Sequence, residues 1–199
     1  VLMPNMNGTV ALMLGLSAYG RVPAMLNFTA GIRNLQAACR TAKIKTIVTA
    51  RRFIDTAQLS PVIEALQAND GGEDGPRQII YLEDVRKSLT SLEKIGGVAR
   101  KIFARHIHAR QKVTPQDPAI ILFTSGSEGT PKAVVLSHVN LNANAAQIFA
   151  HADGMLTDKD TVFNPLPIFH SFGLTAGFLT GLLNGMKVVL YPSPLHFKQ

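Results

Sequence analysis

The part of the sequence best suited to chemistry is a short stretch of small, hydroxylated and glycine residues that follows an apolar run. The run, Ala119 to Phe123, contains β-branched and aromatic residues and favours a buried strand. The residues that follow it and could bind a ligand are Thr124, Ser125, Gly126, Ser127, Glu128, Gly129, Thr130 and Lys132. Glycines permit close backbone approaches, and successive N–H groups can form an anion-binding concavity. Together with the positive charge of Lys132, these features predict a polyphosphate site.

Two familiar loop motifs do not describe this stretch. The Walker pattern fails because Pro131 precedes Lys132 and Ala133 follows it. The nucleophile elbow fails because G-x-S-x-G is not met around Ser125 or Ser127. Since Ser, Thr, Gly and Pro are also ordinary turn residues, a solvent-exposed turn is the structural alternative.

A second stretch combines stiff backbone with aromatic rings. Pro165 and Pro167 restrict the chain, and Phe169, His170 and Phe172 follow at the junction with an apolar segment. On its own, His170 is typical of a histidine in a core or at a helix start. Its interpretation therefore depends on the loop at residues 124–132.

Both stretches resemble core motifs of the AMP-forming adenylating enzymes, which include acyl-CoA synthetases, peptide-synthetase adenylation domains and luciferases. Residues 124–132 match the phosphate-binding loop of that superfamily, although Ala133 stands where a glycine is common. The Leu-Pro-x-Phe-His-x-x-Gly run at 166–173 resembles its next core motif. The resemblance implies that ATP is bound by the loop with Mg²⁺ on its phosphates, and that His170 lies beside the acyl-adenylate. Glu128 suits such a site only if it points away from the phosphates or toward the metal.

Four segments narrow the resemblance further: residues 23–31, 124–129, 170–175 and 190–196. Together they look like the synthetase half of the bifunctional acyl-ACP synthetase/2-acylglycerophosphoethanolamine acyltransferases. This implies an ATP-dependent long-chain fatty acid ligase that forms an acyl-adenylate and then a thioester on acyl carrier protein, linked to lysophospholipid reacylation. It also implies a place on the cytoplasmic side of the inner membrane. The alternatives are an acyl-CoA synthetase or other adenylating enzyme, and a non-catalytic nucleotide- or lipid-binding module.

Several motifs of those enzymes are not found in the 199 residues. There is no H-x-x-x-x-D acyltransferase motif, no Tyr-Gly-x-Thr-Glu segment and no Thr-Gly-Asp segment. The chain also begins with Val1 rather than methionine. We therefore expect residues 1–199 to be a partial N-terminal adenylation domain, with the C-terminal part and the acyltransferase half outside it, and to be inactive alone.

Composition is that of a globular chain, with 46% hydrophobic and 17% charged residues. One cysteine, Cys39, excludes an internal disulfide, and its alanine-rich helical surroundings predict a core thiol. The net charge of +7 raises the question of nucleic acid, but no zinc-finger spacing, basic heptad region or aromatic-studded basic sheet supports it. The most apolar stretch, residues 172–183, is too short to span a membrane.

Alternating strand and helix patterns predict a layered α/β domain with a largely parallel sheet. Strands are expected at 1–3, 45–49, 78–82, 119–123 and 161–163, with extended segments at 22–27 and 134–135. Helices are expected at 31–42, 53–68 with an interruption at Pro61, 140–150, and from a cap at Thr9 to Tyr19; residues 69–76 are expected to be a loop. Ligands of such sheets bind where strands end, which is where the loop after Phe123 lies.

The segment from Lys94 to Lys112 contains six basic and no acidic residues. As one helix it would place its basic residues on one side and Ile95, Val98 and Ile102 on another. Two interpretations are open: a helix laid over the domain with a solvated basic face, or a contact with anionic lipid or an acidic carrier protein.

Overall fold

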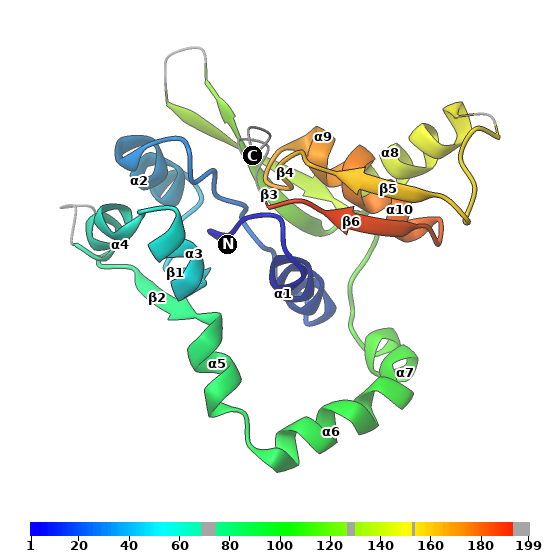
Figure 1. Ribbon diagram of the computed structural model, residues 1–199, viewed down its shortest axis with the longest axis horizontal. Helices are drawn as coiled ribbons and strands as arrows, with labels where there is room; N and C mark the ends of the chain where they lie inside the picture. The colour runs from blue at the N-terminus through cyan, green and yellow to red at the C-terminus, as the bar shows by residue number, and fades with distance from the viewer. Residues whose placement is uncertain (69–74, 127–129, 153, 193–199) are drawn as a thin grey trace.

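The computed structural model describes residues 1–68, 75–126, 130–152 and 154–192, along which helices and strands alternate (Figure 1). The helices are α1 (Asn7–Ala18), α2 (Ile32–Thr41), α3 (Arg51–Thr56), α4 (Ser60–Gln67), α5 (Leu82–Ser88), α6 (Ser91–Ile102), α7 (Ala104–Ala109), α8 (His138–His151), α9 (Ser171–Leu174) and α10 (Thr180–Leu183), with a π-helical turn, η1 (Thr175–Leu179), between the last two. The strands are β1 (Thr46–Thr49), β2 (Gln78–Tyr81), β3 (Pro118–Ser125), β4 (Pro131–Ser137), β5 (Thr161–Asn164) and β6 (Lys187–Leu190).

Parallel pairing dominates, as predicted for the α/β class. β1 pairs in parallel with β2 through a crossover that contains α3 and α4, and β5 pairs in parallel with β6 through α9, η1 and α10. The exception is β4, which runs antiparallel to β3 directly after the loop. The predicted α/β fold is therefore confirmed, with one antiparallel hairpin added to it.

Two extended segments join β1 to β3 through backbone hydrogen bonds. The Leu2 N–H donates to the Val48 carbonyl at 3.0 Å, and the Leu26 N–H donates to the Val1 carbonyl at 2.9 Å. On the other side, the Met25 N–H donates to the Ile121 carbonyl at 2.9 Å, and Ala24 forms a parallel bridge with Ile121. The predicted extended segments at 1–3 and 22–27 thus link β1 and β3 across the centre of the molecule.

Apolar residues fill both sides of this central layer. Neighbouring residues alternate between two core clusters: Met3 and Met25 belong to one, and Leu2 and Leu26 to the other. The second cluster also contains Cys39, which is fully buried and confirms the predicted core thiol. Burial on both faces is what parallel α/β sheets require.

Two helix boundaries differ from the sequence prediction for local reasons. α1 begins at Asn7 rather than after a cap at Thr9. Thr9 lies within the helix, and its hydroxyl donates to the Pro4 carbonyl at 2.6 Å. The break between α3 and α4 falls around Gln58, which has a positive φ of 53°, and not at Pro61. Pro61 lies in the first turn of α4, where a missing N–H costs nothing. The predicted loop at 69–76 lies mostly outside the described residues.

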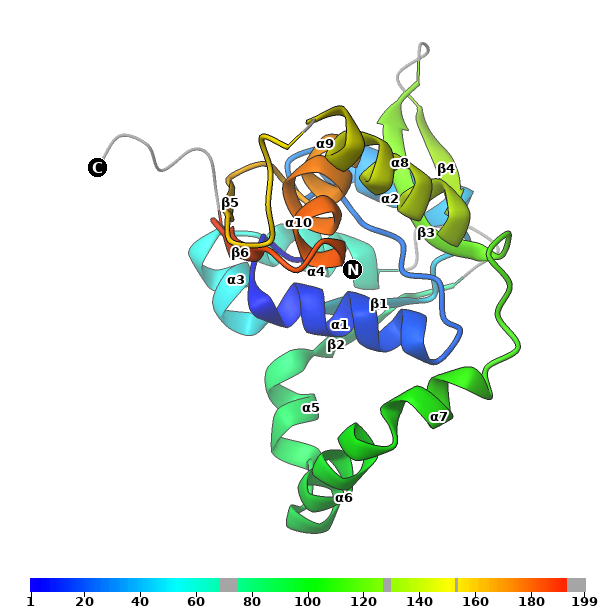
Figure 2. The same cartoon turned by 90° about the vertical axis from the view of Figure 1, so that its right-hand side faces the viewer.

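The interpretation of residues 94–112 as one helix laid over the domain is wrong. The helix breaks at Phe103, which separates α6 from α7, and no residue of α5, α6 or α7 is buried. In both views these three helices lie below α1 and extend away from the rest of the molecule (Figures 1 and 2). Among the described residues, none of the helices combines the length and the apolar composition needed to cross a membrane.

Candidate functional site

The stretch predicted to bind phosphate joins the two strands of an antiparallel hairpin. Thr124 and Ser125 are the last residues of β3, and Pro131 and Lys132 are the first of β4. Thr124 pairs with Lys132, and Ser125 pairs with Pro131. Because the Cβ atoms of directly paired residues lie about 5 Å apart on one face of a sheet, the register places the side chains of Thr124 and Lys132 on the same face of the hairpin, next to the loop.

Gly126, directly after β3, approaches the backbone of Thr130 so closely that a larger residue would force one of them to shift. A Cβ atom there would lie 2.2 Å from the Thr130 carbonyl oxygen. Thr124, Thr130 and Lys132 are exposed around it. The structure thus places four of the predicted loop residues. Ser127, Glu128 and Gly129 lie outside the described residues, and the Ser125 side chain is likewise not described.

A broad hollow lies between the hairpin and α2. It has a volume of about 860 Å³ and is lined by residues before and along α2 together with Thr130 and Pro131. Arg33 and Arg40 are among its lining residues. These arginines could not be selected from the sequence, because only the fold brings α2 beside the loop. They add positive charge next to the predicted phosphate site.

A smaller hollow of about 100 Å³ continues along the same side of the hairpin. Asn27, Asn34, Phe123 and Thr124 are among the residues that line it. Leu35 and Ala38 supply apolar surface from α2. Polar groups and apolar walls therefore alternate beside the end of β3, which is the arrangement typical of small-molecule sites.

His170 caps the helix that follows the second motif. The Phe172 N–H donates to His170 Nδ1 at 3.4 Å, and the imidazole is exposed. A neutral imidazole that accepts at Nδ1 carries its proton on Nε2. His170 can therefore present an Nε2–H donor to a ligand while its other nitrogen holds the start of α9.

Two buried asparagines fix the backbone that leads to His170. Asn164 donates from Nδ2 to the Gly173 carbonyl at 3.0 Å and accepts from the Leu166 N–H at 3.1 Å. Asn5 donates to the Leu166 carbonyl at 2.6 Å and accepts from the Ile168 N–H at 2.9 Å. Neither asparagine stands out as a site residue in the sequence. Their signal was weak, since an asparagine beside a proline is also a common turn residue.

Aromatic contacts connect the same motif to the centre of the fold. The rings of Phe28 and Phe169 meet edge to face with their centroids 5.2 Å apart, and Phe28 meets Phe53 of α3 in the same way at 5.0 Å. Phe169 also packs against the core cluster that contains Met25 and Ile168. The residue before His170 is therefore held by packing as well as by hydrogen bonds.

Among the described residues, the two motifs share one hydrophobic cluster, which contains Ile120, Leu122 and Ile168, but their candidate ligand-binding side chains are not joined. No side-chain hydrogen bond or ion pair there joins His170 to Thr124, Thr130 or Lys132. The described residues also contain no group of three or more His, Cys, Asp or Glu side chains that could hold a metal ion. The candidate site is thus a polar, basic surface around the β3–β4 hairpin. His170 lies apart from it at the start of α9, which is held by its own hydrogen bonds and packing contacts.

A model of one protein family, described as "AMP-binding enzyme", matches residues 1–199. An acyl-CoA ligase, SID4, of Ajellomyces capsulatus is 29% identical over 196 residues, which cover 97% of this chain and 33% of that protein. A long-chain-fatty-acid–AMP ligase of Mycobacterium tuberculosis is 38% identical over 85 residues, which cover 41% of this chain and 14% of that protein.

Solved structures of known proteins share the fold of this chain. The structure described as a Mycobacterium tuberculosis fatty acyl CoA synthetase aligns over 96% of this chain and 34% of that one, with a TM-score of 0.73 and 22% identity. The chain spans about a third of the length of the first two curated relatives it matches.

Proposed function

Because the chain belongs to the family of AMP-binding enzymes, we propose that it forms the N-terminal part of the adenylation domain of a long-chain fatty acid ligase. The observation that carries the proposal is the β3–β4 hairpin. It sets Thr124 opposite Lys132, closes on Gly126 and opens beside the arginines of α2. The remainder of the adenylation domain and an acyltransferase half would lie outside residues 1–199.

In the proposed first step, a fatty carboxylate oxygen attacks the α-phosphorus of ATP. The bond from that phosphorus to the bridging oxygen breaks, pyrophosphate leaves with the electron pair, and an acyl-adenylate forms. The hairpin N–H groups, the Thr124 and Thr130 hydroxyls and Lys132 would hold the β- and γ-phosphates, with Arg33 beside them. Rate acceleration of this kind comes mainly from positioning and from charge stabilisation.

In the proposed second step, a thiol attacks the acyl carbonyl and AMP leaves as its bond to the acyl carbon breaks. We propose the phosphopantetheine thiol of acyl carrier protein as the acceptor, in the service of lysophospholipid reacylation. His170 would lie by the acyl-adenylate and donate from Nε2–H. This role of His170 is supported by its exposed imidazole, whose Nδ1 already accepts from the Phe172 N–H.

Coenzyme A is the second candidate for the thiol. The specific observation in its favour is that relatives such as the Ajellomyces capsulatus protein are named acyl-CoA ligases. The first step is common to both candidates. They differ only in which thiol receives the acyl group.

Magnesium is expected with ATP because a divalent cation neutralises polyphosphate charge. The described residues around Thr124, Thr130 and Lys132 supply no cluster of acidic ligands for it. We therefore assign no protein ligand to the metal and no step to it. When bound, it would supply positive charge that offsets part of the phosphate charge.

The test is thioester formation by the longer protein that carries this chain, supplied with ATP and palmitate. Carrier protein bearing phosphopantetheine and coenzyme A are compared as acceptors at equal concentration. The proposal predicts faster acylation of the carrier protein. Faster acylation of coenzyme A would favour the second candidate, and failure to acylate either would contradict the ligase assignment.

A further inference from the structure

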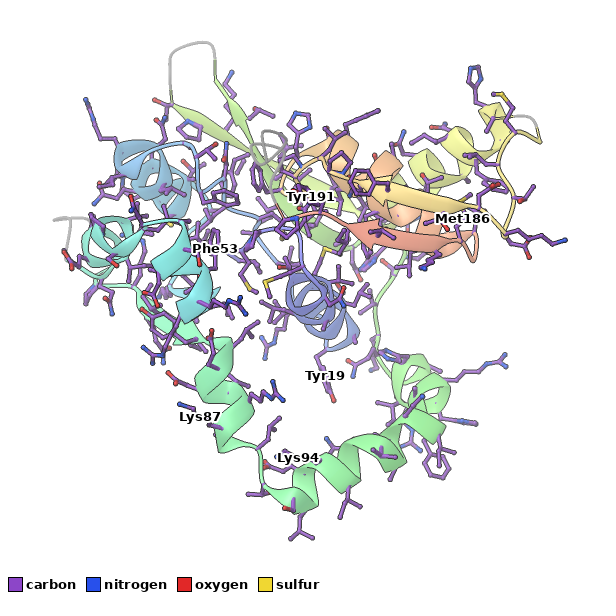
Figure 3. The ribbon with its side chains drawn as sticks, viewed as in Figure 1. Tyr19, Phe53, Lys87, Lys94, Met186 and Tyr191 are labelled. Atoms are coloured by element: carbon purple, nitrogen blue, oxygen red, sulfur yellow. The ribbon has the colours of Figure 1, made fainter. Side chains whose placement is uncertain are left out.

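Residues 82–113 form an arm that extends away from the core, and we call it the basic arm. It contains α5, α6 and α7, none of which buries a single residue. Both views show it as a separate chain of helices below α1, with Lys87 on α5 and Lys94 on α6 (Figures 1–3). A segment of this length without a packed face needs a reason to be helical.

One side of α6 is a continuous apolar stripe in contact with solvent. Leu92, Ile95, Val98 and Ile102 recur at spacings of three and four, which places them on one face of a helix. They are 81%, 67%, 68% and 78% exposed, respectively, and Phe103 follows at 60%. Scattered apolar side chains are ordinary on a protein surface, but an aligned row along a helix marks an interaction face.

Basic residues flank the stripe and extend beyond it. They are Lys94, Arg100, Lys101, Arg105, Arg110 and Lys112, and no acidic residue lies among them. None of the six forms an ion pair with the described part of the chain. Lys94 and Lys101 lie seven residues apart, beside the apolar row on the same helix. Attraction to negative charge and burial of apolar surface can therefore act together.

The acidic residue nearest to these basic residues in the sequence is Glu93, and its carboxylate is engaged in hydrogen bonds at the start of α6. Glu93 accepts from the Thr90 N–H and from the Thr90 hydroxyl, both at 2.8 Å, and the Thr90 oxygen accepts from the Glu93 N–H at 3.2 Å. This capping box defines where α6 begins and so fixes the register of the stripe. Glu93 lies on the side of the helix away from the stripe.

Both ends of the basic arm are attached to the core. At its start, Asp84 pairs with Arg51, whose guanidinium carbon lies 3.9 Å from the centroid of the Tyr81 ring. Just beyond its end, the Val139 N–H donates to the Pro115 carbonyl at 2.8 Å. Anything that binds the arm would therefore be tied to the core at both ends of the arm.

We propose that the basic arm binds the surface of an anionic phospholipid bilayer. α6 would lie in the plane of the interface, with the apolar row among the lipid chains and the lysines and arginines at the phosphates. A contiguous apolar row with basic flanks is typical of helices that lie in this interface. An acidic protein partner would match the charges but leaves the length and alignment of the apolar row unexplained. The proposal goes beyond the ligase function and does not depend on it.

Vesicle flotation of the 199-residue chain tests the charges. We expect the chain to float with vesicles of phosphatidylcholine and phosphatidylglycerol in equal parts, and to bind phosphatidylcholine alone at least about tenfold more weakly. Lys101→Glu/Arg105→Glu should lose about tenfold or more of the anionic binding. The matched control, Lys159→Glu/Lys187→Glu, changes the net charge equally at exposed sites outside the arm and should float like wild type.

A fluorescence measurement tests the apolar row independently. The chain contains no tryptophan, so Ile102→Trp introduces a unique reporter in the stripe. Its emission should shift to shorter wavelength on addition of the anionic vesicles. Met155→Trp, at a residue that is 80% exposed outside the arm, should not shift. Because both positions are exposed, neither change should disturb folding, and thermal unfolding verifies this.

Three results would overturn the proposal. The first is wild-type chain that does not float with anionic vesicles. The second is equal flotation of the arm variant and the control variant. The third is an Ile102→Trp emission that does not change with vesicles while the chain binds an acidic carrier protein, which would make the arm a protein-binding surface instead.

Discussion

At the scale of single residues, the site depends on two kinds of side chain. Some could bind a ligand, and others hold the surrounding backbone in place. Thr124, Gly126, Thr130 and Lys132 could be selected from the sequence because their order is specific. Asn5 and Asn164 could not, since their hydrogen bonds reach backbone groups that only the fold brings near. Arg33 escaped notice for the same reason. Local order predicts a loop, whereas long-range packing decides what surrounds it.

Asn164→Ala should lower the free energy of unfolding by about 1–3 kcal/mol, because it removes the bonds that the buried Asn164 side chain makes to the Gly173 carbonyl and the Leu166 N–H. Asn144→Ala removes an exposed asparagine from the interior of α8 and should be neutral or slightly stabilising. Chemical denaturation of both variants measures the difference. Equal stability of the two would show that the bonds of Asn164 contribute nothing net.

Gly126→Ala should distort the hairpin, since its Cβ atom would lie 2.2 Å from the Thr130 carbonyl oxygen. We expect a loss of about 1–3 kcal/mol of stability, as is usual for overpacked sites. Gly15→Ala, where a Cβ atom meets nothing within 4 Å, is the matched control and should not destabilise α1. Thermal unfolding compares them, and an unchanged melting temperature for Gly126→Ala would rule out the close approach.

At the scale of elements, the sequence predicted the type of most helices and strands but not every boundary. The apolar spacing of residues 94–112 continues through Phe103, so periodicity alone could not reveal the break between α6 and α7. β4 was expected only as a short extended segment. Its pairing with β3 over Pro131–Ser137 makes it a full strand. In each case, contacts beyond the local pattern set the limits of the element.

The start of α6 should weaken in acid. Hydrogen bonds from the Thr90 N–H and hydroxyl lower the pKa of Glu93 below its ordinary value of 4.5. The folded state therefore gains stability from this carboxylate above pH 4.5, and loses it as the pH falls through the lowered folded-state pKa. Thr90→Ala removes the hydroxyl bond but keeps the backbone N–H of residue 90, which is the larger cause, so it should reduce this part of the pH dependence, and the exposed Thr41→Ala should retain it in full.

Amide hydrogen exchange in the first turn of α6 measures this effect against pH. Asp160 forms a similar pair of bonds with Thr157 and has a lowered pKa for the same reason, with the Thr157 N–H as the larger cause. The pH dependence of exchange must therefore be compared at the amides of α6 and not over the whole chain. Identical exchange profiles for wild type and Thr90→Ala would refute the cap.

At the scale of the whole molecule, the chain matches the AMP-binding enzyme family over its full length but spans about a third of the length of the first two relatives. Its layered α/β class was predictable from the alternation of strand and helix patterns. The free-standing basic arm was not, because an amphipathic pattern normally indicates a helix packed against a core. Its exposed apolar row became visible only when the structure left it uncovered.

The 199-residue chain alone should not catalyse adenylation, because it contains neither a Tyr-Gly-x-Thr-Glu nor a Thr-Gly-Asp segment. Palmitate-dependent exchange between ATP and labelled pyrophosphate measures the reverse of the first step directly. The expected rate is that of a blank without protein. Robust exchange by the isolated chain would contradict this prediction without affecting the proposed role of the hairpin.

The central claim is that the β3–β4 hairpin holds the phosphates of ATP during adenylation. Its most direct test is the same exchange assay on the longer protein, comparing wild type, Lys132→Ala and the exposed control Lys159→Ala. We predict palmitate-dependent exchange by wild type, a loss of about 10²-fold for Lys132→Ala, as is common when a charge-stabilising group is removed, and an unchanged rate for Lys159→Ala. Exchange by Lys132→Ala at the wild-type rate, or no exchange by wild type, would contradict the account.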